Sequence, residues 1–367
     1  MTHIMHIIES LEFGGAEKVV VHLANKLSSD YKVSICLTKR SGELTKEVND
    51  NIQVHCLNSP DRNDFSLPSQ IRTLLIENKV DILHSHNWGV YLESALALRK
   101  VRYTKLVHTV HGPYMNYAPG IKSALKIKLR HMAEKHVSKY VYKIVAVSRS
   151  IEDYIKKDIK IKKSKIEIIH NGITDISEGV SRNVSDIVRF VTVGRLAKIK
   201  NQKMLLEAFS LVGSEHRNFH LTFAGDGPEM QPLVHYCKKL GLEDNVSFLG
   251  FRTDVKDVLS NNDVFLLSSD YEGISIALLE SMSLSMPAIA TNVGGIPDTI
   301  KNDQTGFLVP LGDVNMYSNK ISEFVKNSEL VKTMGMNARQ FFLEEFHEDV
   351  VLNGYRSLYE RCVSSNQ

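Results

Sequence analysis

Two cations in a single loop could neutralise a diphosphate. Arg195 and Lys200 stand in the segment VGRLAKIKNQ, residues 193–202, directly after a β-branched run. Open α/β sheets bind ligands at the carboxyl ends of their strands, so both side chains are expected at the mouth of a sheet. For this loop taken alone, two solvated surface cations are the preferred interpretation.

Two carboxylates eight residues apart could hold the polar groups on either side of such a diphosphate. In the segment SDYEGISIALLESMS, residues 269–283, Glu272 follows the strand-like run VFLLSS, and a helix is expected from near Ile274. The free amides and positive end of a helix attract anions. Glu280 then lies about 12 Å further along the axis, so one acid can meet sugar hydroxyls and the other a ribose. The alternative is an ordinary amphipathic helix with an exposed Glu280.

Three further glycine turns precede expected helices. Phe13, Gly14, Gly15 and Ala16 follow the opening apolar run, and the other two turns are AGDGPE at 224–229 and TNVGGIPD at 291–298. Glycine allows a ligand to approach the backbone amides at a helix start. A tight turn also needs glycine, which weakens the first of these signals. Turn architecture is the preferred explanation of AGDGPE and explains TNVGGIPD equally well.

The elements that must position these residues follow the rhythm of βαβ units. Short β-branched runs alternate with helical patterns along nearly the whole chain, which predicts parallel sheets in an α/β fold. The expected strands are 4–9, 32–38, 53–57, 81–86, 105–110, 143–147 and 166–169 in the first half, and 187–193, 220–224, 246–249, 264–268, 287–291 and 306–309 in the second. Between 175 and 186 the apolar periodicity stops in a Ser-, Gly- and Asn-containing linker. We therefore predict a first domain over residues 1–175 and a second over 186–346.

Composition excludes several classes of protein. The chain is 43% hydrophobic and 24% charged, as is usual for a globular protein, and no stretch approaches the roughly 20 apolar residues of a membrane span. The opening MTHIMHIIES does not have the pattern of a signal peptide, so we expect a cytoplasmic protein. The four cysteines, Cys36, Cys56, Cys237 and Cys362, are scattered, which indicates neither a disulfide framework nor a zinc site.

A basic segment stands out in the first half of the chain. Residues 1–180 contain 27 Lys and Arg against 19 Asp and Glu. Much of the excess lies in residues 121–144, in which Glu134 is the single acid. The cations of this segment are Lys122, Lys126, Lys128, Arg130, Lys135, Lys139 and Lys143. The apolar residues Ile121, Leu125, Leu129, Met132 and Tyr140 recur at helical spacing. Such a basic amphipathic helix can contact an anionic membrane, although packing on its own domain is at least as good an explanation. Binding to nucleic acid is disfavoured because the basic residues are not interleaved with the aromatic residues that a base-stacking platform uses.

The ordered series GG, GRLxxxK, GDGPE, EGxxxxxxE and GGIPD resembles the retaining glycosyltransferases of family 4, most strongly over residues 187–310. The resemblance implies a GT-B fold, in which two Rossmann-like domains flank a deep interdomain cleft. It also implies that the final helix, within 347–367, packs back on the first domain.

Residue roles implied by this resemblance fall on matching positions. Arg195 and Lys200 would contact the diphosphate, Glu272 the transferred sugar and Glu280 the ribose. His111, in HTVHGP, would contact the donor sugar near the reacting carbon, so His111 and Glu272 are the expected catalytic residues. The remaining expected donor-binding residues are Gly14, Gly15, Gly250, Phe251, Arg252, Gly273, Ile274, Ser275 and Ile276. His84, His86 and His108 have no such match and are expected to be structural.

Three positions depart from the family pattern. Asn201 and Ser285 stand where glycine is usual, and Asp298 stands where glutamate is usual. These changes affect the expected loop shapes and base contacts.

The expected reaction is transfer of a hexose or N-acetylhexosamine from a nucleotide-diphosphate sugar, a UDP-sugar by family frequency. The acceptor would be a glycan or lipid-linked molecule, in bacterial cell-surface polysaccharide biosynthesis. The resemblance implies retention of configuration by front-face attack. No DxD string occurs, so neither a metal nor another cofactor is expected, and protein groups would stabilise the leaving diphosphate.

Two alternatives from other classes use the same ligand. A nucleotide-sugar 2-epimerase would need acid and base groups around C2 of the sugar, which the EGxxxxxxE string disfavours. A binding protein without turnover is disfavoured by the intact Arg195, Lys200, Glu272 and His111.

Overall fold

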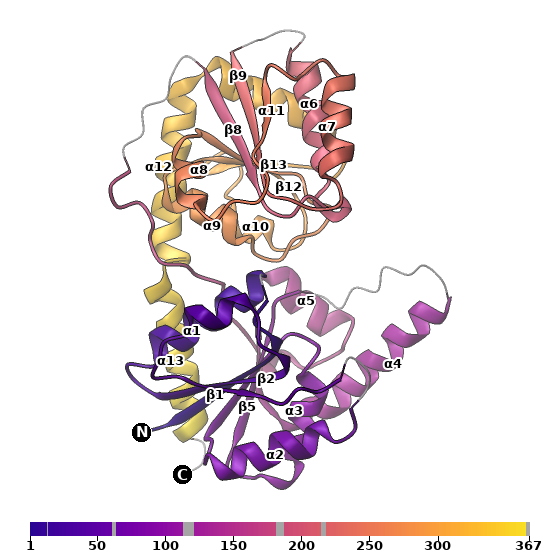
Figure 1. Ribbon diagram of the computed structural model, residues 1–367, viewed down its shortest axis with the longest axis vertical. Coiled ribbons are helices and arrows are strands. Elements are labelled where there is room, and N and C mark those ends of the chain that lie inside the picture. The colour runs from indigo at the N-terminus through magenta and orange to yellow at the C-terminus, as the bar shows by residue number, and fades with distance from the viewer. Residues whose placement is uncertain (13, 61–63, 113–120, 181–186, 214–217, 365–367) are drawn as a thin grey trace. The chain divides into compact units, whose positions relative to one another are not determined.

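The structure is a computed structural model that describes residues 1–12, 14–60, 64–112, 121–180, 187–213 and 218–364 (Figure 1). Phe13 of the first glycine turn and residues 181–186 of the predicted linker lie outside this range. The chain divides into two compact units. Unit 1 comprises Met1–Asn171 with Asp349–Gln367, and unit 2 comprises Gly172–Glu348.

Unit 1 is built on a seven-stranded parallel sheet in the order β3-β2-β1-β4-β5-β6-β7. Its strands are β1 His3–Ser10, β2 Lys32–Arg40, β3 Gln53–Cys56, β4 Ile82–His86, β5 Lys105–Val110, β6 Val141–Ala146 and β7 Ile166–Ile168. The strand order reverses between β1 and β4, which pair directly. The seven strands predicted in the first half are confirmed to within two residues at each end.

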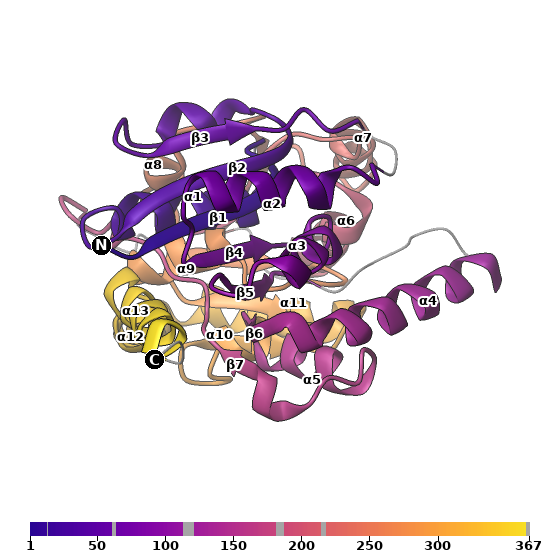
Figure 2. The same ribbon diagram turned by 90° about the horizontal axis from the view of Figure 1, so that it is seen from below.

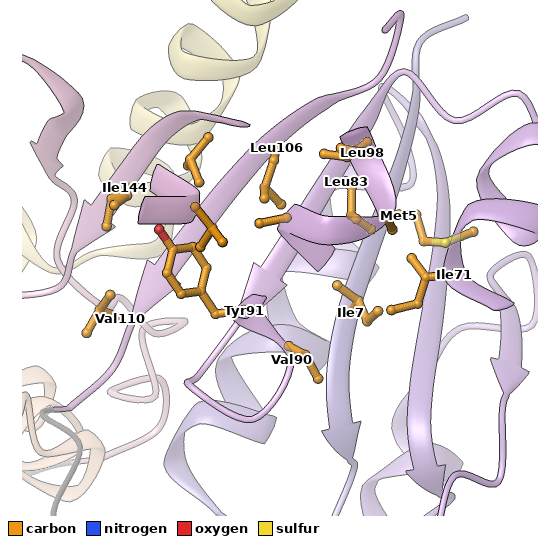
Figure 3. Packing of buried hydrophobic residues seen from close by; sticks show 14 of the residues in the cluster. Met5, Ile7, Ile71, Leu83, Val90, Tyr91, Leu98, Leu106, Val110 and Ile144 are labelled. Carbon is orange, nitrogen blue, oxygen red and sulfur yellow. The ribbon is translucent and has the colours of Figure 1, made fainter. Parts of the chain in front are cut away.

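Helices cover both faces of this sheet. They are α1 Gly15–Leu27, α2 Leu67–Glu77, α3 Tyr91–Ala97, α4 Ile121–Val137, α5 Arg149–Lys157 and α13 Glu348–Ser364. Because βαβ crossovers are right-handed, α1, which leads toward the β3 edge, lies on the face opposite to α2 and α3. Figure 3 shows Met5, Ile7 and Leu83 close to Ile71 of α2, and Tyr91 of α3 belongs to the same buried cluster. The alternate strand residues, including His6 and His84, therefore point to the other face.

Unit 2 repeats this plan with a six-stranded parallel sheet in the order β10-β9-β8-β11-β12-β13. Its strands are β8 Val188–Val193, β9 Phe219–Ala224, β10 Val246–Phe248, β11 Val264–Leu267, β12 Ala288–Thr291 and β13 Gly306–Val309. All six agree with the prediction to within one residue at each end. The strand order reverses between β8 and β11, the position at which open α/β sheets hold ligands.

Two apolar layers enclose the sheet of unit 2. Its helices are α6 Gln202–Gly213, α7 Met230–Lys239, α8 Val255–Ser260, α9 Ile276–Ser283, α10 Ile296–Thr299, α11 Val314–Lys326 and α12 Ser328–Glu345. Residues of α6, α7 and α11 form one buried cluster, and residues of α8, α9 and α12 form another on the opposite face. The sheet is thereby fixed from both sides, and its carboxyl edge is left to loops.

The helix predicted over 121–144 is shorter than expected. Helix α4 ends at Val137, a 3-10 turn covers Ser138–Tyr140, and the remaining residues belong to β6. The run VYKIVA is rich in β-branched residues and pairs with β5, so strand pairing overrides the helical spacing of the preceding residues. Lys139, Tyr140 and Lys143 therefore do not lie on the helix.

The exposed face of α4 carries large apolar side chains. Leu125, Leu129 and Met132 are 56%, 57% and 60% exposed. In Figure 1 and Figure 2 the first half of α4 extends away from the sheet of unit 1. Glu134 anchors the other side of the helix, since it is fully buried and accepts a 2.6 Å hydrogen bond from Arg130 Nε. Among the described residues, no helix is both long and apolar enough to cross a membrane.

Both positions at which glycine is replaced have left-handed backbone. Asn201 has φ +47° and Ser285 has φ +58°. Glycine adopts this conformation without strain, and asparagine tolerates it better than most residues. Both residues therefore have a backbone conformation that glycine adopts easily.

Burial lowers the pKa most strongly in five of the histidines that lie in or beside the sheet of unit 1. His6, His84, His86 and His108 are fully buried, and His111 is partly buried. Burial lowers the pKa of His6 and His108 to about 3 and that of His111 to about 4, and it holds the pKa values of His84 and His86 well below the ordinary value. All five are therefore neutral in the folded protein near pH 7.

Acid should weaken the folding of unit 1 through these histidines. A histidine with a lowered folded pKa contributes its full stability above the unfolded pKa of about 6.5 and loses it as the pH falls toward the folded value. Each contributes up to about 1.4 kcal/mol per pH unit in this window. We expect His108→Phe to remove one such contribution. Between pH 6.5 and 5 the unfolding free energy of both proteins should fall, and the fall should be about 2 kcal/mol smaller for the variant than for the wild type.

Urea unfolding at a series of pH values measures this difference. Parallel pH profiles for the wild type and His108→Phe would contradict a neutral, buried His108.

Candidate active site

Four of the loops at the carboxyl edge of the unit 2 sheet carry sequence motifs, and hydrogen bonds join them. The amide of Leu196 donates to the carbonyl of Asp226 at 2.9 Å, and the amide of Asp270 donates to the carbonyl of Ile199 at 2.8 Å. The amide of Gly295 reaches the carbonyl of Glu272 at 3.0 Å. Motifs separated by up to about a hundred residues are thus brought to one surface of one unit.

Lys200 and Glu272 form an ion pair at the centre of this surface. They follow β8 and β11, the two strands between which the order reverses. The side chains are 28% and 15% exposed. Ser269 Oγ donates to the Glu272 carboxylate at 3.2 Å, and Ser268 Oγ donates to the Lys200 carbonyl at 2.9 Å. The cation and the carboxylate are therefore held in fixed positions beside the sheet edge.

Gly294 holds the Glu272 loop from its other side. Its φ is +54°, and a Cβ at this position would overlap the carbonyl oxygen of Glu272. Thr291 Oγ1 also donates to the carbonyl of Ser269 at 2.6 Å. Only glycine allows this approach, which explains the first glycine of the GGIPD turn.

Helix α9 begins at Ile276, two residues later than expected. Ser275 is its N-cap, and its Oγ accepts a hydrogen bond from the Leu278 amide at 3.4 Å. Gly273 and Ile274 therefore belong to the loop between Glu272 and the helix. Glu280 lies in α9 and is partly buried. The helix start still follows Glu272 directly, so its positive end lies next to the ion pair.

Arg195 is exposed in the same loop as Lys200. Its carbonyl accepts a hydrogen bond from Gln202 Nε2 at 3.0 Å, which fixes the backbone. No partner for its guanidinium group is found within the described part of the chain. Arg195 is thus a cation held by its backbone, with a side chain available to an anion.

Gly250, Phe251 and Arg252 follow β10, two strands away from β8. Gly250 has φ +68°, and Phe251 is 62% exposed. Arg252 Nε donates to Asp254 Oδ1 at 2.7 Å, so this cation already has a carboxylate partner. A cavity of about 320 Å³ lies beside Arg252, but neither Lys200 nor Glu272 lines it.

In unit 1, Gly14 caps α1 and Gly15 is its first residue. A Cβ at position 14 would overlap the Glu17 carboxylate, which folds back over the start of the helix. Burial, with a smaller contribution from Glu9, raises the pKa of Glu17. A carboxylate of the protein thus lies where the sequence predicts an approaching ligand.

His111 follows β5 and contacts another histidine. Its Nε2 lies 3.3 Å from Nδ1 of His86, and its Nδ1 has no partner among the described residues. His6, His84 and His86 also form a buried group whose ligand atoms lie within 4.8 Å of one another, close enough to be considered for a metal ion. Sequence analysis missed His6, although its strand pairs with that of His84 and His86 and its alternation places it on their face.

Two protein-family models match this chain. The model described as Glycosyltransferase Family 4 matches residues 13–175, and the model described as Glycosyl transferases group 1 matches residues 178–341. The N-acetyl-alpha-D-glucosaminyl L-malate synthase of Bacillus anthracis is 28% identical over 313 residues, 81% of this chain and 78% of that protein. The UDP-Gal:alpha-D-GlcNAc-diphosphoundecaprenol alpha-1,3-galactosyltransferase of Escherichia coli is 25% identical over 342 residues, 88% and 87% of the two chains.

Solved structures match the chain from end to end. A glycosyltransferase from Rickettsia africae has a TM-score of 0.83 with 21% identity and covers 99% of this chain and 98% of its own. Anabaena HepE in complex with UDP also has a TM-score of 0.83, with 18% identity, and covers 98% of this chain and 100% of its own. Because the two family models divide the chain almost where its two units meet and cover most of both, the chain belongs to the glycosyltransferases of group 1 and family 4, and its two parallel-sheet halves are those of the GT-B fold.

Proposed function

We propose that the protein transfers a hexose or N-acetylhexosamine from a UDP-sugar to a glycan or lipid-linked acceptor, with retention of configuration and without a metal ion. The observation that carries this proposal is the Lys200–Glu272 ion pair where the strand order of unit 2 reverses. Arg195 and the start of α9 stand beside this pair in the same loops. A diphosphate linked to a sugar on one side and a ribose on the other matches this distribution of charge.

Donor binding would replace the Lys200–Glu272 ion pair with an ionic contact to Lys200 and hydrogen bonds to Glu272. A diphosphate carries more negative charge than one carboxylate, so it competes with Glu272 for the ammonium group of Lys200. The released carboxylate can accept hydrogen bonds from sugar hydroxyl groups. Ser269, which donates to Glu272, holds the carboxylate during this exchange. The ion pair thus keeps both groups ordered before the donor arrives.

Departure of the nucleoside diphosphate develops negative charge on its phosphate. Lys200, Arg195 and the free amides of α9 supply positive charge that is already positioned, which is the main requirement for stabilising such a transition state. No protein nucleophile is assigned in this scheme. The leaving phosphate accepts the proton of the acceptor hydroxyl on the same face, and the configuration of the sugar is retained.

The remaining roles complete the donor site. Glu280 holds the ribose, the segment from Gly250 to Arg252 shelters the base, and His111 contacts the transferred sugar near the reacting carbon. The exposed ring of Phe251 gives the base an apolar surface.

Two of the similar proteins support the proposed acceptor and leaving group. The galactosyltransferase of Escherichia coli acts, by its name, on a diphosphoundecaprenol-linked sugar, and HepE was solved with UDP. We therefore place the reaction in bacterial cell-surface polysaccharide biosynthesis, with UDP as the leaving group.

The cations assigned to the diphosphate give the most direct test of this function. With a donor chosen from UDP-, GDP- and ADP-sugars by thermal shift, we expect Arg195→Ala combined with Lys200→Ala to lower turnover at least about 100-fold, since both residues stabilise the leaving group. Lys203→Ala is the matched control. Lys203 lies in the first turn of α6 and pairs with Glu207, and its removal should leave turnover near normal. Normal turnover in the double variant would refute the assignment.

Two glycines with left-handed backbone test the position of Glu272. We expect Gly294→Ala to lower kcat/KM by about 10- to 100-fold, because its methyl group displaces the Glu272 backbone. Gly241→Ala is the control, because it introduces the same type of backbone strain at φ +65° but brings the new Cβ near no other atom. It should lower stability by about 1 kcal/mol and leave activity unchanged. Steady-state kinetics and thermal melting separate the two effects. Equal activity in the two variants would contradict the role of the loop.

We further propose that α4 contacts the inner face of the cytoplasmic membrane. Its exposed Leu125, Leu129 and Met132 recur at helical spacing, and Lys126, Lys128 and Lys135 flank them. An apolar stripe with flanking lysines suits an interface of anionic lipid head groups. A lipid-linked acceptor would be reached at the same surface.

Liposome co-sedimentation tests this contact. We expect binding to vesicles containing phosphatidylglycerol, weakened by salt, and little binding to phosphatidylcholine alone. Leu129→Ser should weaken binding, whereas Leu211→Ser, at an exposed leucine of α6, should not. Indifference to lipid charge would exclude the proposed contact.

A further inference from the structure

The cavity of about 320 Å³ beside Arg252 lies on one face of the unit 2 sheet. Its floor is formed by Arg189 of β8, Thr222 of β9 and Ser247 of β10, and residues of α8 form a wall. Arg189 is the second residue of β8, so it lies about 16 Å along the strand from the loop that begins at Gly194. The cavity therefore opens beside the strands, and the proposed donor site lies at their carboxyl ends.

Strand alternation places polar side chains on the floor of this cavity. Leu221 and Phe223 point to the other face of the sheet, where they belong to the cluster that includes α6, α7 and α11. Thr222 points to the face of α8, as does Ser247, its register partner on β10. Polar residues are ordinary on a sheet face that meets water, so the floor by itself does not indicate a ligand.

Two of the lining residues are almost completely buried and still have free hydrogen-bonding atoms. Thr222 is 7% exposed and Asn262 is 6% exposed. The Asn262 amide Nδ2 donates to the carbonyl of Val258 at 2.8 Å, but Asn262 Oδ1 and Thr222 Oγ1 have no partner among the described residues. Polar atoms of such buried residues are usually hydrogen-bonded. Because both residues line the cavity, a molecule bound there would supply the missing partners.

The charged side chains that line the cavity are two arginines and two aspartates, so their charges cancel. Arg252 Nε donates to Asp254 Oδ1 at 2.7 Å, whereas the side chains of Arg189 and Asp257 have no charged partner among the described residues. An anionic ligand would be repelled by Asp257, and a cationic ligand would be repelled by Arg189. A neutral ligand that both donates and accepts hydrogen bonds suits the two unpaired groups.

We propose that this cavity binds one neutral sugar unit, with Arg189, Thr222 and Asp257 as its polar contacts. Sugar hydroxyl groups donate and accept hydrogen bonds, so they match a guanidinium group, a hydroxyl group and a carboxylate. Leu249 and Val258 also line the cavity and can pack against the C–H groups of the ring. The volume lies near the lower end of the roughly 300–1,000 Å³ of ligand pockets, which suits a single unit. The site is additional to the proposed donor site and does not depend on it.

Sugar titrations followed by ligand-observed NMR test the site in the full-length protein. The probes are D-glucose, N-acetyl-D-glucosamine and the disaccharide N,N′-diacetylchitobiose. We expect binding to the wild type and at least about 10-fold weaker binding to Arg189→Ala, which loses hydrogen bonds from a charged group. Arg99→Ala removes an exposed arginine of unit 1 and should leave binding unchanged. Tighter binding of the disaccharide than of its monosaccharide would assign the cavity to a glycan chain, and equal binding would assign it to a free sugar.

Thr222→Val tests the buried hydroxyl group while keeping the shape of the side chain. The hydroxyl has no partner among the described residues, so its removal should leave the melting temperature unchanged or raise it. The affinity for the sugar should fall about 3-fold, as for one lost neutral hydrogen bond. A lower melting temperature with unchanged affinity would give Thr222 a structural role and contradict the proposed contact.

Glu272→Ala separates this cavity from the proposed donor site. Sugar binding should persist in this variant, because Glu272 does not line the cavity. Binding that is lost in Glu272→Ala and kept in Arg189→Ala would place the sugar in the donor site and overturn the proposal, while leaving the proposed function intact. Failure of all three probes to bind would also overturn it. Binding of inorganic phosphate that requires Arg189 and excludes the sugars would make the cavity an anion site instead.

Discussion

The ion pair between Lys200 and Glu272 is the contact on which the proposed donor site of unit 2 depends. It can form because β8 and β11 are parallel neighbours, so the loops that follow them leave the sheet at the same edge. Backbone hydrogen bonds from Asp270 to Ile199 and from Gly295 to Glu272 join the adjoining loops to it. The strand order thus determines that the two loops lie together, and Lys200 and Glu272 supply the charges at this position.

The fold could be predicted because short runs rich in β-branched residues indicate strands from local sequence alone. The grouping of Lys200 with Glu272 could also be predicted, since the carboxyl ends of parallel strands must gather at one edge. The sequence predicted Asn201 and Ser285 as departures from a family pattern of glycine. Only the structure shows that both have left-handed backbone, the conformation that favours glycine.

Features that depend on contacts distant in the sequence could not be predicted. The helical spacing of residues 121–140 gave no sign that pairing with β5 would end the helix at Val137. Glu17 covers the glycine turn before α1 because its side chain folds back, which no spacing rule encodes. His6 lies beside the buried histidines of β4 because of strand register and side-chain alternation. This grouping became visible only once the pairing of β1 with β4 was known.

Hydrogen–deuterium exchange with and without UDP tests the central claim most directly, because it locates the donor site without any substitution. We expect slower exchange in the segments 194–202 and 269–280, which surround the ion pair, and smaller changes at the turn 291–296. Protection confined to other surfaces of unit 2, such as the cavity beside Arg252, with unchanged exchange at 194–202 and 269–280, would contradict it.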